Sequence, residues 1–252
     1  MKKIILNFLK KLGYKVQKIN KPEFFVDMDK DFFALAEKCK PHTMTSTERL
    51  YSVYKSVEYC INNNIEGDYV ECGVWKGGSS MMIALSLLKN NIKDKKIYLY
   101  DTYEGMSEPT EDDINYSLNK ADKKYENTMN IKSGSDWCRS EIDEVKQNLY
   151  STGYPKENII FVKGKVEDTI PQTISPKIAL LRLDTDWYES TKHEMNNLYP
   201  ILSEKGVLII DDYGHWLGCR KAVDEYFAEN NISLLLNRID YTGRTAIKTT
   251  PS

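Results

Sequence analysis

The chain has 252 residues, a formal net charge of -2 and 29% charged side chains. This length is enough for one large α/β domain with a substantial buried core. Because positive and negative charges are nearly balanced, the composition gives no indication of nucleic acid or another polyanion as a partner.

The cysteines, five in all, are odd in number, and none stands in a Cys-x-x-Cys pair. Free thiols in a reducing cytosol are therefore expected, and a zinc site is not. The apolar stretch within residues 1–11 is too short for a signal peptide or a membrane span, and lysines follow it at once. We interpret this stretch as a short amphipathic helix and predict a cytoplasmic protein without a transmembrane span.

Residues 1–42 show no firm periodicity after this first helix and are predicted to form a helical or extended appendage. The main domain is expected to span residues 43–252. Near its start, Thr45 followed three residues later by Glu48 resembles a capping box, which satisfies free backbone N–H groups at a helix N-terminus. Apolar residues at helical spacing follow up to Ile61, so this segment is predicted to be the first helix of the domain.

Residues 69–80 predict a strand, a glycine-bearing turn and an apolar helix. Gly73 permits the tight turn, and Gly77 and Gly78 would allow a ligand to approach the backbone at the helix N-terminus. The turn has neither the Gly-Lys-Ser/Thr of a P-loop nor the spacing of a dinucleotide-binding fingerprint. Glu71 is costly to bury in a strand without a partner, so we expect it to contact a ligand or an amine.

The next strand, residues 96–101, also ends in an acid, Asp101. An acid at this place in an open α/β sheet commonly binds a ribose diol, and the alternative for Asp101 alone is a turn residue. Residues 102–140 form a long polar excursion, which is typical of a lid or substrate loop. A strand at residues 158–163 then leads into a turn whose acids, Glu167 and Asp168, could accept from an adenine amine or cap a short helix.

Two apolar runs, residues 178–183 and 206–210, are interpreted as neighbouring buried parallel strands. Each is followed by two aspartates, which are Asp184 and Asp186 after the first run and Asp211 and Asp212 after the second. Ligands bind at the carboxyl ends of such strands, and carboxylates that converge there repel one another unless a cation or a proton lies among them. Oxygen ligands alone indicate a hard cation, Mg²⁺, Mn²⁺ or Ca²⁺. The alternative is that individual aspartates cap the following helices.

The chain closes with an amphipathic helix over residues 221–230 and two short segments, 232–236 and 245–248, that could pair as an antiparallel hairpin. Strand and helix alternate throughout the main domain. We therefore predict an α/β fold with a seven-stranded, doubly wound and mostly parallel sheet, closed by an antiparallel final hairpin.

Six stretches of the sequence are specific when they are taken together. They are TMTS at 43–46, VECGVWKGG at 70–78, YDTYEGM at 100–106, LRLDTDWYEST at 181–191, IIDDYG at 209–214 and CRKAV at 219–223. In this order they resemble the macrocin O-methyltransferase family over roughly residues 43–248. The resemblance implies a Rossmann-like class I methyltransferase fold, S-adenosylmethionine (SAM) as the methyl donor, and Mg²⁺ or Mn²⁺ as the metal.

The resemblance also implies roles for individual residues. Those expected to bind SAM, from its methionine end through the ribose to the adenine, are Thr45, Glu71, Gly73, Ser79, Asp101, Gly164, Val166, Glu167, Asp168 and Asp184. Those expected to bind the metal are Asp184, Asp211 and Asp212. Asp186 would be the general base that removes the proton of the acceptor hydroxyl, and His215 and Arg220 would contact the substrate.

One residue departs from the family pattern, because Thr185 stands where members often have glycine, in Asp-Gly-Asp. The replacement narrows the conformational freedom of the turn and could alter the position of Asp186 relative to the metal. His215 is the alternative base, since histidine titrates near neutrality. It ranks second because the family pattern puts the base at Asp186.

The sequence thus predicts a SAM- and Mg²⁺-dependent O-methyltransferase that acts on a sugar hydroxyl. The expected acceptor is a nucleotide-activated hexose or heptose for surface polysaccharide biosynthesis, and a homodimer is expected by analogy. The alternatives are a natural-product sugar, a catechol-like diol, which suits the same metal geometry, and a non-catalytic SAM-binding protein.

Overall fold

The computed structural model describes residues 25–130 and 134–249, together with Leu9, Leu12 and Gly13. The chain divides into two compact units, residues 1–31 and 32–252, and the architecture below is that of the second unit. The amphipathic helix expected within residues 1–11 lies almost entirely outside the described residues. The expected boundary between an appendage and the main domain at residues 42 and 43 stays a prediction.

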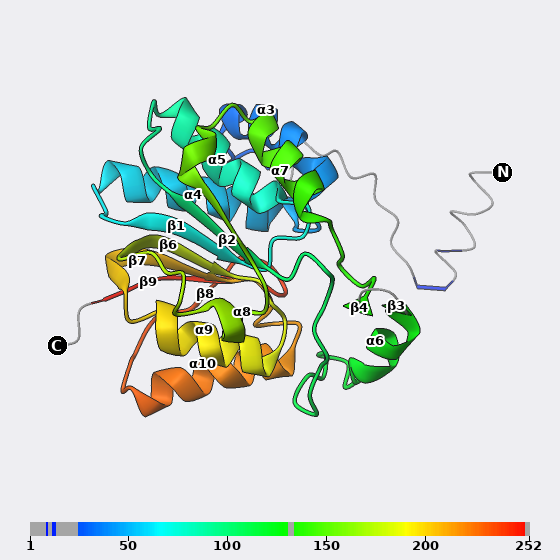
Figure 1. Cartoon of the computed structure of the whole chain (residues 1–252). Helices are drawn as coiled ribbons and strands as arrows, with labels where there is room; N and C mark the ends of the chain where they lie inside the picture. The colour runs from blue at the N-terminus through cyan, green and yellow to red at the C-terminus, as the bar shows by residue number, and fades with distance from the viewer. Residues whose placement is uncertain (1–8, 10–11, 14–24, 131–133, 250–252) are drawn as a thin grey trace. The chain divides into compact units, whose positions relative to one another are not determined.

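Seven strands of the described chain form one sheet (Figure 1). In spatial order they are β5 (Ile159–Lys163), β2 (Ile97–Asp101), β1 (Asp68–Cys72), β6 (Ile178–Leu183), β7 (Leu202–Ile210), β9 (Arg244–Ile247) and β8 (Asn237–Arg238). The first five run parallel, and β9 is antiparallel to both β7 and β8. The predicted mostly parallel sheet with an antiparallel final hairpin is confirmed.

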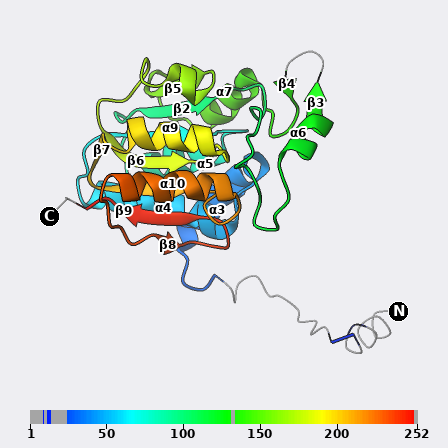
Figure 2. The same ribbon diagram turned by 90° about the horizontal axis from the view of Figure 1, so that it is seen from below.

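Helices cover both faces of the sheet (Figures 1 and 2). Those on one face are α3 (Lys30–Cys39), α4 (Thr47–Asn62), α5 (Gly78–Lys89) and α7 (Ile142–Ser151), and those on the other are α8 (Val166–Thr169), α9 (Tyr188–Leu198) and α10 (Leu217–Glu229). Because both faces are covered, all six residues of β6 are buried, and five of the six, all but Arg182, are apolar.

The excursion at residues 102–140 lies beyond the carboxyl ends of the parallel strands and carries α6 (Asp122–Thr128), β3 (Met129–Asn130) and β4 (Gly134–Ser135) (Figure 1). Its anchor is the fully buried Asp113, which accepts a 2.8 Å hydrogen bond from the backbone N–H of Tyr188 at the start of α9. A carboxylate at a helix N-terminus satisfies a free N–H group and the helix dipole. The excursion is therefore fixed to the main domain, and its role as a lid stays a prediction.

The expected capping box is wrong by one residue. Ser46, and not Thr45, caps α4, because Ser46 has extended backbone angles and its Oγ accepts from the N–H of Arg49 at 3.1 Å. The hydroxyl of Thr45 lies 2.9 Å from that of Thr43 instead. Thr45 is consequently part of the loop that precedes the helix.

The expected strand at residues 232–236 is also wrong, since this segment is in no strand and the hairpin with β9 is formed by the two residues of β8 instead. Ile232, Leu234 and Leu236 are partly buried against the core, whereas Leu235 is 77% exposed. The alternation in the sequence thus reflects an extended segment packed on one side, without a strand partner.

Candidate active site

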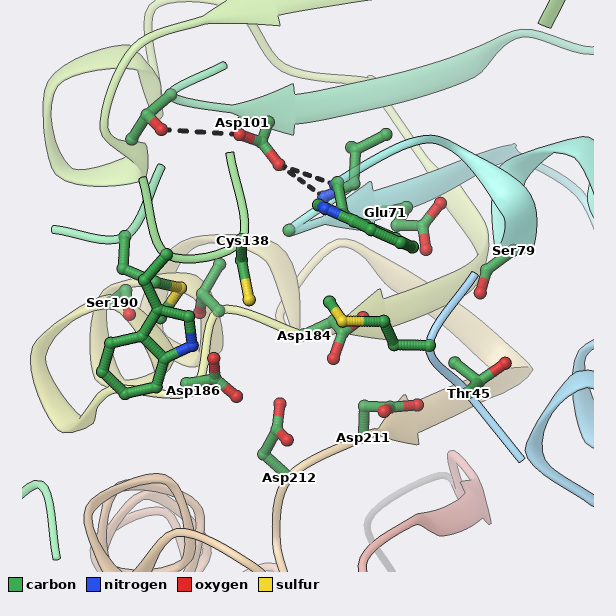
Figure 3. Close-up of a pocket in the computed structure, with 18 of the residues that line it drawn as sticks. Thr45, Glu71, Ser79, Asp101, Cys138, Asp184, Asp186, Ser190, Asp211 and Asp212 are labelled. Carbon is green, nitrogen blue, oxygen red and sulfur yellow. Dashed lines mark hydrogen bonds between the residues drawn. The ribbon is translucent and has the colours of Figure 1, made fainter. Parts of the chain in front are cut away.

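A cavity of about 350 Å³ opens at the carboxyl ends of the parallel strands. It lies where the chain order of the sheet reverses, since the chain runs from β1 through β2 to β5 on one side of β1 and then returns to β6 on the other side. Such a switch point is the usual ligand site of a doubly wound sheet. Figure 3 shows that Asp184, Asp186, Asp211 and Asp212 lie around the same part of this cavity.

Three of these acids form a potential metal site. Asp184, Asp211 and Asp212 each offer an oxygen atom, and the three oxygens lie within 4.8 Å of one another. Asp212 Oδ2 is buried and has no hydrogen-bond donor among the described residues. Burial and the neighbouring carboxylate of Asp186 hold the pKa of Asp212 well above its ordinary range. A cation or a shared proton is required to relieve this repulsion, and oxygen ligands alone favour Mg²⁺ or Mn²⁺.

Arg182, one residue before the end of β6, holds the acids together. Its side chain is only 1% exposed and donates to Glu71 at 2.5 Å, to Asp184 at 2.7 Å and to Asp211 at 2.6 Å. Glu71 thus pairs with a guanidinium of the protein itself, and its expected contact with a ligand or an amine stays a prediction. A single charged residue within an apolar run is the sequence signal that could have indicated Arg182.

A second arginine contacts the same cluster from α4. Arg49 forms a short ion pair with Asp211 and a second one, at 3.1 Å, with Asp240 in the loop between β8 and β9. In the described part of the chain, the carboxylates of this cluster outnumber the two guanidiniums that contact it. The carboxylates are Glu71, Asp184, Asp186, Asp211 and Asp212. A divalent cation would offset most of the excess negative charge.

Asp186 has a left-handed backbone conformation, with φ at 68°. Burial and the nearby charge of Asp184 raise the pKa of Asp186 to about 7. Thr185 is not left-handed, and its hydroxyl donates to the buried Glu194 on α9 at 3.0 Å. Threonine in place of the family's glycine therefore imposes no backbone strain at position 185, and it adds a contact that fixes the turn.

The other half of the cavity is organised by Asp101 at the end of β2. Its carboxylate accepts backbone N–H groups of Val74 at 2.7 Å, Trp75 at 3.1 Å and Tyr103 at 2.7 Å. Asp101 therefore connects the turn after β1 to the start of the excursion. It also lines the cavity, so the predicted ribose contact is compatible with its position.

Two glycines of the β1 turn are required by contacts within the protein. A side chain at Gly73, whose φ is 81°, would overlap the carbonyl oxygen of Asp184. A Cβ atom at Gly78 would lie 2.6 Å from the carbonyl oxygen of His42. The backbone of the preceding loop thus requires glycine at position 78. Gly78 also lines the cavity, so the expected approach of a ligand to its backbone stays a prediction.

Most of the predicted site residues meet in this one cavity. Those that line it are Thr45, Glu71, Gly73, Ser79, Asp101, Gly164, Val166, Glu167, Asp184, Asp186, Asp211, Asp212 and His215. In the described structure, Asp168 and Arg220 are not among the lining residues. Asp168 is exposed on α8, and Arg220 is exposed on α10, 3.7 Å from Asp224. Their predicted contacts with adenine and substrate stay predictions.

The wall beyond the acids is aromatic, and the sequence did not indicate it. Trp137 from the excursion and Trp216 before α10 line the cavity, with ring centroids 6.1 Å apart. Lys124 Nζ lies 3.9 Å from the ring centroid of Trp137. These residues come from segments far apart in the chain, so no local pattern could have revealed that they meet.

Comparison with known proteins gives concordant results. The family model described as macrocin-O-methyltransferase (TylF) matches residues 5–246. Demethyldecarbamoylnovobiocin O-methyltransferase from Streptomyces niveus is 34% identical over 80% of this chain and 74% of its own length. Mycinamicin III 3''-O-methyltransferase from Micromonospora griseorubida is 29% identical over 80% of this chain and 76% of its own length. A tetracenomycin-C rhamnosyl 4'-O-methyltransferase from Streptomyces olivaceus is 33% identical over 80% of this chain and 74% of its own length.

Solved structures agree with these sequence relatives. The O-methyltransferase NovP superposes with a TM-score of 0.73, at 32% identity and with 83% of each chain covered. The calicheamicin methyltransferase CalS11 has a TM-score of 0.58 at 15% identity, with 93% of this chain and 99% of that chain covered, and it supports the fold alone. The fold is that of a class I, Rossmann-like methyltransferase, as predicted.

Proposed function

Because the chain belongs to the macrocin O-methyltransferase family and is a SAM-dependent O-methyltransferase, we propose that it methylates a sugar hydroxyl with the help of a divalent cation. The sugar is suggested by the names of the relatives, one of which includes a rhamnosyl group and a 4'-oxygen. The cation rests on one observation above all: three aspartate oxygens lie within 4.8 Å of one another.

Asp184, Asp211 and Asp212 would hold Mg²⁺ or Mn²⁺. The buried, unpartnered Oδ2 of Asp212 fits this assignment, because a carboxylate oxygen out of water requires a positive partner. When bound, the cation supplies stabilisation of the negative charge that develops on the acceptor oxygen. Arg182 orients two of the three ligands by donating to Asp184 and Asp211.

SAM, when bound, supplies the methyl group in an already activated form. Its methionine end would lie against Glu71, Gly73, Ser79 and Thr45, its ribose against Asp101, and its adenine against the turn at residues 164–168. Support comes from the cavity, which all of these residues except Asp168 line. The protein's main task is then alignment of the acceptor oxygen with the methyl group.

Asp186 would act as the general base. Burial and Asp184 raise its pKa to about 7, so the carboxylate would take the hydroxyl proton near neutral pH as the acceptor oxygen takes the methyl group. The sulfur–methyl bond would break in the same step, and the donor would leave as S-adenosylhomocysteine. His215 is the second candidate. Burial and the charges of Lys124 and Arg49 lower its pKa, so the neutral ring is favoured, and Nδ1 lies 3.2 Å from the hydroxyl of Tyr241.

For the acceptor, we keep a nucleotide-activated hexose or heptose for surface polysaccharide as the first candidate. The names of the relatives favour a natural-product sugar as the second, and a catechol-like diol is the third. The relatives are named as enzymes, which gives a non-catalytic SAM-binding role no support. We also propose that the protein is a homodimer in the cytoplasm. Separately, no helix in the described residues combines the length and apolarity that a membrane crossing needs.

The test is SAM consumption with nucleotide-activated hexoses and heptoses, glycosides and catechols, with Mg²⁺ or with a chelator. We expect turnover of a sugar that requires the cation and that collapses in Asp186→Asn. Turnover that survives the chelator would remove the metal assignment. Turnover of catechols alone would show that the acceptor is a catechol-like diol and not a sugar. Turnover retained by Asp186→Asn would assign the role of general base to His215.

A further inference from the structure

We propose that Tyr116, His215 and Tyr241 form an aromatic rim that binds a planar aromatic or heteroaromatic group attached to the acceptor sugar. The inference rests on the proposed sugar O-methylation and adds a second subsite to it. The group could be the base of a nucleotide-linked sugar or the aglycone of an aromatic glycoside, since both present the same flat face.

The three rings meet although they come from three separate segments. Tyr116 belongs to the excursion, His215 to the loop before α10, and Tyr241 to the loop between β8 and β9. Their centroids are 5.4 Å apart for Tyr116 and His215, 6.0 Å for Tyr116 and Tyr241, and 5.9 Å for His215 and Tyr241. All three pairs are edge-to-face, which is a favourable geometry for neighbouring aromatic rings.

Folding of the core does not account for these rings. Tyr116 is 60% exposed and Tyr241 is 53% exposed, so more than half of each residue's surface meets solvent. Clustered exposed aromatic groups commonly mark a binding surface. His215 and Tyr241 also line the cavity, so the aromatic rim is continuous with the site that holds the acids.

The aromatic rim is held in place before any ligand binds. The backbone N–H of Tyr116 donates to the carbonyl of His215 at 2.8 Å. The N–H of His215 donates to the carbonyl of Asp212 at 2.9 Å, and the hydroxyl of Thr242, next to Tyr241, donates to the carbonyl of Asp211 at 2.7 Å. Preorganised rings lose little entropy when they stack on a ligand. The same bonds place the aromatic rim directly beside the two aspartates.

Lys124 provides a way to tell the two sources of the aromatic group apart. It lies in the excursion and lines the same cavity. A diphosphate between the sugar and a base would meet its positive charge, whereas an aryl glycoside carries no such group. Lys124→Met is therefore expected to weaken binding of a nucleotide and to leave binding of an aryl glycoside unchanged.

The experiment is calorimetric titration of the full chain loaded with S-adenosylhomocysteine. The probes are uridine diphosphate, a 4-nitrophenyl glycoside and the methyl glycoside of the same sugar. We expect at least one aromatic probe to bind more tightly than the methyl glycoside. Tyr116→Ala and Tyr241→Ala should each weaken binding of that probe about tenfold, which is the scale of one base–aromatic stack. Tyr116→Phe should bind the probe with unchanged affinity.

Leu118→Ala is the matched control. Leu118 is two residues from Tyr116 in the same turn and is 77% exposed, but it is outside the aromatic rim, so its removal should change no affinity. Unchanged cofactor affinity shows that each variant is folded. The proposal is overturned if the aromatic probes bind no better than the methyl glycoside or if the tyrosine variants bind them normally. It is also overturned if sedimentation shows that the tyrosine variants dissociate an oligomer while their affinity for the aromatic probes is unchanged. Because binding needs no turnover, these outcomes are independent of the SAM-consumption assay.

Discussion

The acid cluster and the aromatic rim are built in opposite ways. The acids stand at the ends of adjacent parallel strands, where Glu71 pairs in register with Arg182, and Arg182 is 1% exposed. The aromatic rim is made of three loops, and its tyrosines are more than half exposed. Sheet geometry thus fixes the groups that we propose for the chemistry, while loops carry the groups that we propose for selection of the acceptor. Substitutions in the first region should affect folding and rate, and those in the second should affect affinity.

The strongest test of this comparison is Arg182→Met. Removing the guanidinium leaves the buried carboxylates of Glu71, Asp184 and Asp211 without their shared partner. Breaking a buried ion pair from one side costs about 3–5 kcal/mol, so urea denaturation should show a large loss of stability. Arg220→Met is the control, because Arg220 pairs at 3.7 Å with Asp224 on an exposed helix face, and exposed pairs contribute at most about 1 kcal/mol. Equal losses in the two variants would contradict a structural role for Arg182.

The next largest effect should come from Asp186→Asn. General-base catalysis contributes about 10²- to 10⁴-fold, so kcat should fall by that range, with little change in cofactor affinity. Asparagine keeps the size of the side chain and removes the proton acceptor. His215→Asn is the paired variant, expected to raise KM for the acceptor more than it lowers kcat. A reversed result, with kcat lost in the histidine variant alone, would exchange their roles.

The acid cluster could be predicted from the sequence because parallel strands end at the same edge of a sheet. An acid directly after an apolar run therefore reaches the cavity, as Asp101, Asp184 and Asp211 do. The aromatic rim could not be predicted, since contacts between Tyr116 and Tyr241 depend on the paths of two loops. The same limit explains the error at residues 232–236. The alternation of buried and exposed residues is present there, but whether a segment finds a strand partner depends on the tertiary structure.

Metal binding should appear as added thermal stability. A cation that binds only the folded protein adds about 2.7 kcal/mol at one hundred times its dissociation constant, so Mg²⁺ or Mn²⁺ should raise Tm. Asp212→Asn should abolish this rise, because it removes one of the three clustered carboxylates. Asp143→Asn is the control, since its side chain on α7 is 83% exposed and it should keep the full rise. A rise of equal size in both variants would place the cation elsewhere.

The smallest expected effect concerns the turn that carries Asp186. Thr185→Val keeps the shape of the side chain and removes the hydroxyl that donates to Glu194 at 3.0 Å. Glu194 is fully buried, and burial holds its pKa well above the ordinary value. This favours the neutral carboxyl, which loses less stabilisation than a carboxylate would when the hydrogen bond from Thr185 is removed. The loss of unfolding free energy should therefore lie at the low end for an unsatisfied buried acceptor, about 1 kcal/mol.

Thr185→Ser retains the hydroxyl and should leave stability unchanged. Because the hydroxyl fixes the turn between Asp184 and Asp186, the valine variant should also lower kcat slightly, while binding of the aromatic probes stays the same. This split would sharpen the contrast between the two regions, since a change in the turn would affect rate without affecting acceptor affinity. A loss of aromatic-probe affinity in Thr185→Val would instead show that the acid cluster and the aromatic rim are not energetically separate.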